Sequence, residues 1–501
     1  MEYPIKQWTT KLRYQNYGDW PTTYVAALEQ QVSKAPWRLN YHIQPTTGLL
    51  NDPNGFSFFN GEWHLFYQTY PFGPVHGVKS WAHMTSRDLV HWQKDDVSLL
   101  PDSLLDSHGV YSGSALPVGD ELFIMYTGNV RDENWQRQSI QAGAWLTKQK
   151  LLRKIPQALI SQPPAGYTTE FRDPQVFVYQ GEYVMLIGSQ DVAQQGQVVV
   201  YESKDLLDWQ YRGQLHFTEQ QMGFMVECPN LVEVDGQPVM LFCPQGLAQN
   251  ILTYDNIYPN TYVIGTALNM KNLSLEQPTA LQNLDDGFDV YATQAITAPD
   301  GRALAVSWVG LPELTYPSFV DGWAHCLSLV KELRLKEGRL YQYPVVETMA
   351  LRKHERHFNG SLTNETVLMS EGVSQSFELE VNVARHQRGA LRLLANPAED
   401  AYLEISFDTF SGKIEIDRSC AGEPFAEEYG SVRQTAVPEN ADLSLNIFVD
   451  QSICEIFINK GLKVCTLRFF PKEDQKKLLI LSEETLKYDG KLWDLVALPE
   501  E

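Results

Sequence analysis

The sequence predicts an all-β protein, in which a five-bladed β-propeller follows a short N-terminal helical extension and precedes a C-terminal β-sandwich. Two observations lead to this prediction. A tight-turn dipeptide followed by a short apolar run recurs five times, at intervals of 59, 61, 55 and 65 residues. From about residue 350, apolar and polar residues alternate in short segments, which is typical of a sheet with one buried face.

The repeated turns indicate one β-hairpin in each of five equivalent units. Asn-Gly and Asp-Gly favour hairpin turns because both central residues can take φ > 0, and the apolar runs that follow are bounded like strands. A period near 60 residues with several strands fits a propeller blade. The five turns are Asn60-Gly61, Gly119-Asp120, Gln180-Gly181, Asp235-Gly236 and Asp300-Gly301.

A second repeat supports this count of blades. Residues 86–92 (SRDLVHW) match residues 203–209 (SKDLLDW) at an offset of 117 residues, which is two periods. The alternative is a plain β-sandwich, or two unrelated all-β domains whose turns are spaced by chance.

The same patterns divide the chain into three parts. Residues 1–37 form an N-terminal extension, with one helix expected over residues 22–32. Residues 38–345 hold the five units and are expected to form the propeller. Residues 355–501 carry the alternating segments and are expected to form the sandwich.

Composition narrows the class of function. The net charge of −22 argues against nucleic acid and against an anionic membrane surface, because both need a basic footprint. No apolar stretch is long enough for a signal peptide or a transmembrane helix. Six scattered cysteines without a CxxC pair are typical of free thiols in a reducing compartment. We therefore expect a cytoplasmic protein that acts on a small molecule without a metal or other cofactor, in an oligomeric state that the sequence leaves open.

Three carboxylates precede three of the repeated turns at nearly the same distance. Asp52 and Glu227 lie nine residues before the glycine of the next turn, and Asp173 lies eight residues before it. Equivalent positions on the inner strands of a propeller face one central channel, so the three acids are expected to converge there. Glycoside hydrolysis uses such a group, with one carboxylate that attacks and a second that donates a proton.

The neighbours of these acids suggest different protonation states. Asp52 lies between asparagines whose amides can stabilise its ionised form, whereas Glu227 has apolar neighbours that would raise its pKa. Arg172 adjoins Asp173, but neighbours on a strand point apart, so Arg172 is expected to shape the site. Two other interpretations remain open. The acids could be turn formers, because Asp-Pro and Asn-Gly are common in loops, or they could bind Ca²⁺.

Four motifs in the same order resemble glycoside hydrolase family 32, the group of invertases, levanases and sucrose-6-phosphate hydrolases. They are GLLNDPNG (48–55), YSGSA (111–115), RDP (172–174) and ECP (227–229), and the resemblance extends to residues 448–461. It implies a five-bladed propeller, a β-sandwich, and hydrolysis with retention through a covalent fructosyl-enzyme. It also implies Asp52 as nucleophile, Glu227 as acid/base and Asp173 as transition-state stabiliser. The fructose-binding residues that it implies are Asn51, Gln68, Tyr111, Ser112, Arg172 and Trp308. Further candidates for substrate binding are Leu49, Leu50 and His76, the last at a position where secreted invertases tend to have Trp.

Three further stretches, residues 71–92, 126–138 and 321–326, are similar to the bacterial sucrose-6-phosphate hydrolase branch of that family. A phosphate on the glucose 6-position needs cations, and the first two stretches supply several in an acidic chain. The alternative for each cation is a solvated loop charge or, for His83, a core histidine. The candidate phosphate-binding residues are Lys79, His83, Arg131 and Arg137, with His76 nearby.

The expected function is therefore that of a retaining β-fructofuranosidase acting on sucrose 6-phosphate, sucrose or short fructo-oligosaccharides. An intracellular fructan hydrolase or a fructosyltransferase would carry the same three acids and differ in the outer pocket. A non-catalytic sugar-binding propeller is the alternative of a different class. The sandwich is expected to brace the propeller rather than to bind sugar.

Overall fold

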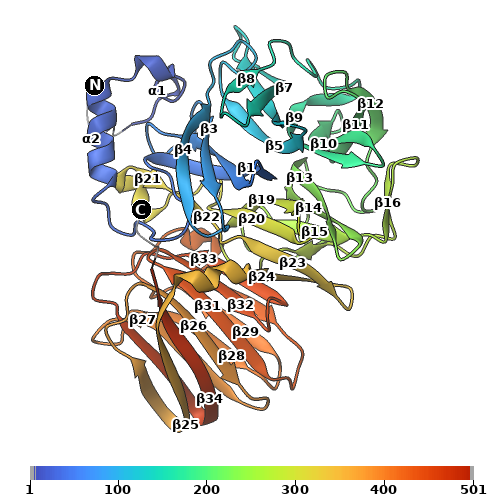
Figure 1. Ribbon diagram of the computed structural model, residues 1–501. Helices are drawn as coiled ribbons and strands as arrows, with labels where there is room; N and C mark the ends of the chain where they lie inside the picture. The colour runs from blue at the N-terminus through green and yellow to red at the C-terminus, as the bar shows by residue number, and fades with distance from the viewer. Residues whose placement is uncertain (1–4, 6, 497–501) are drawn as a thin grey trace.

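The structure is a computed structural model that describes residue 5 and residues 7–496. A ring of β-sheets lies above a second β-domain, and a helical N-terminal segment lies at one side of the ring (Figure 1). No helix in residues 7–496 is long and apolar enough to cross a membrane.

Five four-stranded antiparallel sheets form the blades of a propeller, which confirms the predicted fold (Figure 1). A hairpin of β16 (Ala267–Asn269) and β17 (Ser274–Glu276) follows the third strand of the fourth blade. In chain order the blades contain β1 (Gly48–Phe59), β2 (Glu62–Tyr70), β3 (Ser80–Ser86) and β4 (Trp92–Leu99); β5 (Val110–Val118), β6 (Glu121–Arg131), β7 (Arg137–Thr147) and β8 (Leu152–Lys154); β9 (Tyr167–Tyr179), β10 (Glu182–Asp191), β11 (Gly196–Ser203) and β12 (Gln210–Gln214); β13 (Met225–Val234), β14 (Gln237–Gln245), β15 (Thr261–Ile264) and β18 (Gln282–Asn283); and β19 (Val290–Thr297), β20 (Ala303–Val309), β23 (Lys331–Lys336) and β24 (Arg339–Pro344).

A short segment of the fifth blade closes the ring. It follows the 3₁₀-helix η2 (Pro317–Asp321) and contains β21 (Trp323–Ala324) and β22 (Cys326–Leu327). β21 pairs in parallel with β1, and β22 pairs with β20, so that four residues join the last blade to the first.

The repeated turns lie between the innermost and the second strand of every blade. Asn60 and Gly61 take φ values of 53° and 81°, and the first residues of two later turns, Gln180 and Asp235, have φ values of 50° and 47°. These left-handed conformations are the reason that the sequence favours Asn, Asp or Gly there.

The repeat of residues 86–92 at 203–209 is one turn used twice. In both copies the leucine has a positive φ, 66° at Leu89 and 69° at Leu206. In both, the final tryptophan Nε1 donates a 3.0 Å hydrogen bond to the carbonyl of that leucine. The repeated segment therefore forms the same turn between the third and fourth strands of two blades.

A ring of polar side chains joins the five innermost strands just beyond the three acids. Each side chain forms a hydrogen bond with the backbone of an innermost strand in a neighbouring blade. These bonds satisfy backbone groups of the innermost strands that do not pair with a strand of the next blade. The five links are Asn54 to Gly113 (2.8 Å), Ser114 to Val176 (2.9 Å), Gln175 to Leu231 (2.7 and 2.8 Å), Asn230 to Ala295 (both 3.0 Å) and Gln294 to Phe56 (2.7 Å).

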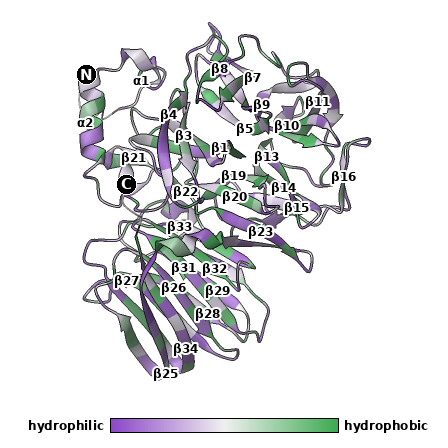
Figure 2. Cartoon of the chain, in the orientation of Figure 1, coloured by the Kyte–Doolittle hydropathy of each residue, from purple (hydrophilic) through white to green (hydrophobic). Residues whose placement is uncertain are grey.

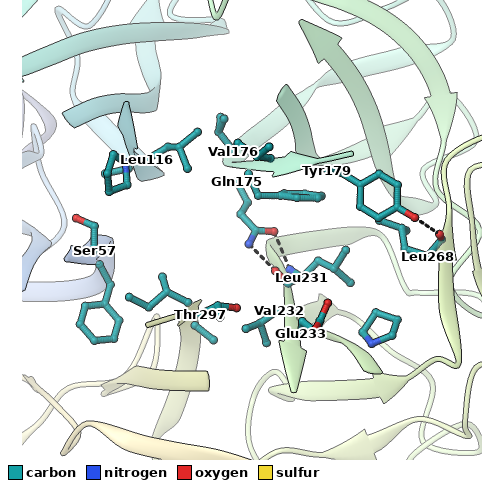
Figure 3. Close-up of a pocket in the computed structure, with 18 of the residues that line it drawn as sticks. Ser57, Leu116, Gln175, Val176, Tyr179, Leu231, Val232, Glu233, Leu268 and Thr297 are labelled. Atoms are coloured by element: carbon teal, nitrogen blue, oxygen red, sulfur yellow. Dashed lines mark hydrogen bonds between the residues drawn. The ribbon is translucent and has the colours of Figure 1, made fainter. Parts of the chain in front are cut away.

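Beyond this ring the channel widens into a cavity of about 760 Å³ at the end opposite the acids. Its walls are mostly apolar side chains from all five innermost strands. Figure 3 shows Leu116, Val176 and Leu231 around it, with the paired hydrogen bonds between Gln175 and Leu231. None of the three acids lines this cavity, so it is separate from the candidate active site.

The second domain is a nearly closed β-sandwich that begins after the 3₁₀-helix η3 (Val346–Leu351) and includes η4 (Glu427–Tyr429). Apolar and polar residues alternate along its strands, as the green and purple bands on β25 and β34 show (Figure 2). Its strands are β25 (Arg352–Ser370), β26 (Ser376–Val383), β27 (Arg388–Ala395), β28 (Leu403–Asp408), β29 (Lys413–Asp417), β30 (Val432–Ala436), β31 (Leu443–Asp450), β32 (Ile453–Ile458), β33 (Lys463–Arg468) and β34 (Lys477–Leu495).

A buried ionic cluster joins the two domains. His42, just before the first blade, lies 3.0 Å from Asp450 Oδ2 through Nδ1 and 3.0 Å from Glu455 Oε1 through Nε2. Burial alone would lower the pKa of His42, but the two carboxylates raise this pKa to about 9. The imidazolium therefore fixes the sandwich against the base of the propeller.

The N-terminal segment contains α1 (Thr10–Arg13), the 3₁₀-helix η1 (Tyr17–Asp19) and α2 (Thr22–Val32), the last over the residues expected to be helical. Tyr24, Leu28 and Val32 form the buried stripe of α2 and pack in one cluster with Trp323 of β21. The segment therefore covers the ring where it closes.

Candidate active site

Each of the five innermost strands has a one-residue bulge at the same level. There, two residues of the innermost strand face one residue of the second strand. A bulge bends a strand and redirects its side chains, so consecutive residues can both face the channel. The bulged pairs are Asn51-Asp52, Tyr111-Ser112, Asp173-Pro174, Cys228-Pro229 and Ala292-Thr293.

The three acids occupy neighbouring positions around this bulge. Asp52 is the second bulged residue of β1, Asp173 is the first of β9 with a φ of 65°, and Glu227 directly precedes the bulge of β13. The prediction of one equivalent position was wrong in this detail, because a count from the turn does not show where strand pairing slips. The three acids nevertheless lie together. Asp173 accepts the backbone N–H of Cys228, which follows Glu227, and Ser112, which donates to Asp52, lines the same narrow space as Asp173.

Asp52 lies at the end of a series of hydrogen-bonded polar side chains. Ser112 Oγ and Gln68 Nε2 donate to Asp52 Oδ2, the second over 3.3 Å. Asn51 Nδ2 donates to Gln68 Oε1 at 3.0 Å, and Lys79 Nζ donates to Asn51 Oδ1 at 2.6 Å. Each amide is therefore held in one orientation, with the NH₂ group of Gln68 toward the carboxylate of Asp52.

Burial shifts the pKa values of Asp52 and Lys79 in opposite directions, because it disfavours the charged form of each group. It raises the pKa of Asp52, as does the charge of Glu227, while Ser112 and the Lys79 ammonium oppose the shift. Burial lowers the pKa of Lys79 to about 7, against the attraction of Asp52. Asn51 lowers the pKa of Asp52, as the sequence suggested, whereas Asn54 Nδ2 binds the backbone carbonyl of Asp52 at 2.8 Å.

Asp173 is held by the backbone of the neighbouring blade. Its Oδ2 accepts the backbone N–H of Cys228 at 3.0 Å, and its own N–H donates to Thr127 Oγ1 at 3.1 Å. Burial raises the pKa of Asp173 to about 7, the charges of Glu227 and Asp52 add to the shift, and Arg172 opposes it. Near neutral pH the three acids therefore share fewer than three negative charges.

Glu227 is bound on both oxygens. Arg172 donates to Oε1 from Nε at 2.9 Å and from Nη2 at 2.8 Å, and the Tyr291 hydroxyl donates to Oε2 at 2.7 Å. The apolar setting predicted for Glu227 was wrong, because its neighbour Val226 packs into the core between two blades while the carboxylate points to Arg172.

A row of alternating charges leads outward from Glu227. Arg172 Nη1 also binds Glu170 Oε2, and Arg137 Nη1 lies 3.0 Å from the same oxygen. Sequence reasoning missed Glu170 and Tyr291. Tyr291 precedes the bulge of β19 as Glu227 precedes that of β13, so extending the register count to the fifth unit could have found it.

Comparison with known proteins agrees with this geometry. The family model "Glycosyl hydrolases family 32 N-terminal domain" matches residues 42–344, and "Glycosyl hydrolases family 32 C terminal" matches residues 347–494. The chain belongs to glycoside hydrolase family 32. It is therefore a glycoside hydrolase, and the non-catalytic alternative is excluded.

Several members of the family are similar to this glycoside hydrolase over nearly the whole chain. A sucrose-6-phosphate hydrolase of Pediococcus pentosaceus is 47% identical over 97% of this chain and 96% of that protein. One from Lactococcus lactis is 43% identical over 98% and 99%. The structure of sucrose-6-phosphate hydrolase from Lactobacillus gasseri has a TM-score of 0.94 at 46% identity, covering 98% of this chain and 100% of that one. A Bombyx mori family 32 β-fructofuranosidase has a TM-score of 0.81 at 28% identity, covering 96% and 100%.

The predicted substrate-binding residues of this glycoside hydrolase fall into two groups. Asn51, Gln68, Ser112 and Arg172 belong to the network around the acids described above, and the Tyr111 ring lies 5.8 Å from the Arg137 guanidinium. The others reach the channel less directly.

Trp308 is buried, with its ring centre 6.0 Å from that of Tyr291 and 6.4 Å from that of the exposed His76. Leu49 and Leu50 are buried with their side chains in hydrophobic clusters. Their backbone remains near the site, where the Leu50 carbonyl lies 3.0 Å from His325 Nδ1.

The predicted phosphate-binding set needs two corrections. His83 is fully buried in the first blade, stacked on Phe66 at 4.1 Å and 2.9 Å from His64 Nδ1, so it is a core histidine. Lys79 is buried beside Asn51 and belongs to the network of Asp52. Arg131 and Arg137 remain at the rim of the channel, and Arg137 is paired with Glu170.

Proposed function

We propose that this protein is a retaining β-fructofuranosidase that hydrolyses sucrose 6-phosphate, and more slowly sucrose, to fructose and glucose 6-phosphate or glucose. The observation that carries this proposal is the group of three carboxylates at one bulge level of the channel, with Arg172 and Tyr291 on Glu227. The names of the relatives that are 43–47% identical support the phosphorylated substrate. Solved fructan hydrolases that are 22% identical share the fold alone and favour no fructan substrate.

In this proposal Asp52 is the nucleophile. Its carboxylate attacks the anomeric carbon of the fructosyl unit while Glu227 donates a proton to the glycosidic oxygen. The leaving sugar departs, and Glu227 then removes a proton from a water molecule that releases fructose from Asp52. Two displacements at one carbon retain its configuration.

Asp173 binds hydroxyl groups of the fructosyl unit in this scheme. Because its pKa is about 7, Asp173 is partly protonated in the free enzyme. Hydroxyl donors from the sugar stabilise its ionised form, so substrate binding favours transfer of the shared proton to another acid of the cluster. Glu227 needs that proton for the leaving oxygen.

We also propose that the protein works in the cytoplasm. All six cysteines are free thiols, as expected for a reducing compartment. Sucrose 6-phosphate carries a dianion that does not cross a membrane unaided, so an enzyme that uses it must meet it where it is formed.

The experiment that tests the proposal compares two variants with matched controls. Asp52→Ala should lose nearly all turnover of both sugars, whereas Asp208→Ala, at an exposed acid, should keep it. Glu227→Gln should lose most activity on sucrose but recover with a fructoside whose leaving group needs little protonation, and the exposed control Glu182→Gln should behave as the unmutated enzyme. Normal sucrose hydrolysis by Glu227→Gln would refute the assignment.

A further inference from the structure

An aromatic shelf lies at the rim of the channel, where the N-terminal segment meets the loop between β6 and β7. The Tyr14 ring packs edge-on to Trp135 with centres 5.0 Å apart, and His108 lies 5.4 Å from Trp135 and 6.0 Å from Tyr14. Trp135 is 45% exposed, an unusual position for so large an apolar ring. Exposed aromatic faces of this kind suit the apolar face of a sugar ring.

The N-terminal segment is a fixed part of this rim. The carbonyl of Arg13 accepts the backbone N–H of Val78 at 2.9 Å, and the Tyr70 hydroxyl donates to the carbonyl of Leu12 at 3.0 Å. A methyl group added at Gly77 would lie 2.6 Å from the Arg13 carbonyl oxygen, so the two backbones are in close contact. Arg13 and Tyr14 are therefore positioned as precisely as residues of the first blade.

Two arginines beside the shelf have no carboxylate partner among the residues that the structure describes. Arg13 has a buried Nε with no hydrogen bond, and its guanidinium has no ion pair within residues 7–496. Arg131 also has an unpartnered Nε, and its guanidinium lies 5.8 Å from the Trp135 ring centre while Nη1 donates to the Trp135 carbonyl at 3.1 Å. In a chain of net charge −22, two such arginines at one site indicate an anionic ligand rather than an internal salt bridge.

The shelf is connected to the acids through the wall of the channel. Tyr111 adjoins Ser112, which donates to Asp52, and the charges of Arg137 and Arg131 reach the Tyr111 phenol. On the other side of the channel mouth lies the exposed His76, whose ring centre is 6.4 Å from that of Trp308. The positive groups of the rim therefore surround the outer end of a site whose inner end holds the acids.

We propose that Arg13, Tyr14, His108, Arg131 and Trp135 form a leaving-group clamp that binds the 6-phosphoglucosyl part of the substrate. The aromatic shelf contacts the glucose ring, and Arg13 and Arg131 bind the phosphate. Guanidinium groups bind phosphate through charge-assisted hydrogen bonds that match its geometry. This inference rests on the proposed function, and it assigns substrate selection to the N-terminal segment, outside the blades.

The test is the ratio of kcat/KM for sucrose 6-phosphate to kcat/KM for sucrose. Arg13→Gln should lower the value for sucrose 6-phosphate by about 10- to 150-fold and leave that for sucrose within about threefold, because only the phosphate contact is lost. Arg131→Gln should act in the same direction. Lys11→Gln, an exposed lysine on the same helix, is the matched control for the change in net charge. Trp135→Ala should raise KM for both sugars, because both carry the glucose ring.

Each outcome supports or overturns one of the two proposals. An unmutated enzyme that hydrolyses neither sugar would refute the proposed function itself. An unmutated enzyme that prefers sucrose 6-phosphate, with the preference kept in both Arg13→Gln and Arg131→Gln, would refute the clamp and leave the proposed function intact. Equal losses on both sugars in folded Arg13→Gln would make Arg13 structural. If Arg13→Gln unfolds at assay temperature, Arg131→Gln alone tests the clamp, since its backbone lies in β6 and does not anchor the N-terminal segment.

Discussion

Arg172 donates from two of its nitrogens, Nε and Nη2, to the same oxygen of Glu227, while Tyr291 holds the other oxygen. The carboxylate of Glu227 therefore has one orientation in the free enzyme. If Glu227 is the acid, as proposed, it needs no reorganisation when the substrate arrives, and such preorganisation is a large part of what positioned groups contribute to a rate.

Arg172→Lys should lower kcat/KM by about 10- to 150-fold although it preserves the charge. A lysine ammonium cannot donate in the planar fork that reaches Glu227 and Glu170 together. Steady-state kinetics with sucrose measures the loss, and thermal unfolding checks that the variant is folded. Unchanged kinetics would show that charge alone suffices at this position.

Asp173→Asn should make the protein more stable at pH 8 while it loses activity. The folded pKa of Asp173, about 7, is above the ordinary value, so ionising this group in the folded state costs free energy. The cost is absent below about pH 4, grows between pH 4 and 7, and is on the order of 4 kcal/mol above pH 7. The difference in unfolding midpoint between variant and parent should follow the same curve. Asp208→Asn, at an exposed site, should show no such curve, and a pH-independent difference for Asp173→Asn would contradict burial of an ionised carboxylate as the cause.

Lys79→Met should lower kcat and move the acid limb of the pH–rate profile to higher pH. The Lys79 ammonium opposes the upward shift of the Asp52 pKa, so its removal raises that pKa further, and the proposed nucleophile becomes protonated at a higher pH. Loss of the orientation of Asn51 and Gln68 should cost about 10-fold or more in kcat. The matched control is Lys94→Met, an exposed lysine of β4. An unmoved acid limb would rule out the electrostatic part of this role.

His42→Gln should destabilise the protein at pH 6 by about 3–5 kcal/mol, because it removes the cation shared by two buried carboxylates and leaves only Lys331, 3.9 Å from Glu455, to balance them. The folded pKa of His42, about 9, lies above the ordinary value. Its contribution is therefore fully present below about pH 6.5 and is lost as pH rises through 9. Unfolding midpoints of parent and variant should approach each other between pH 7 and 10. His354→Gln removes an exposed histidine from its pair with Asp494 and should change stability by less than about 1 kcal/mol.

The fold was predictable from the sequence because its signals are local. A positive φ at Asn60 or Asp235 requires particular residue types, and the alternation along the sandwich strands is visible within six to eight residues. Ring closure by β21 was not predicted, since two residues paired in parallel leave no periodic pattern.

The site was predicted less completely, because its geometry depends on contacts between blades. The three acids were found through the repeat, yet the surroundings predicted for Glu227 were wrong because its partners, Arg172 and Tyr291, come from other blades. Lys79 and His83 were grouped by their proximity in sequence, although both are buried, one beside Asn51 and the other against Phe66. Whether a cation is buried depends on tertiary contacts, which cannot be predicted from the spacing of residues in the sequence.

The ring of polar side chains beyond the acids makes the channel a dead end. Among the described residues, the space at that level is about 20 Å³, bounded by Asn54, Gln175, Asn230 and Gln294, which is room for about one water molecule. Under the proposed mechanism, substrate, water and both products must therefore pass through the single open end of the channel. The glucose moiety leaves first, water enters the space that it vacates, and fructose leaves last. A glucose product that stays bound at the channel opening delays every later step. The rate at which the rim releases the leaving group therefore sets an upper limit on turnover.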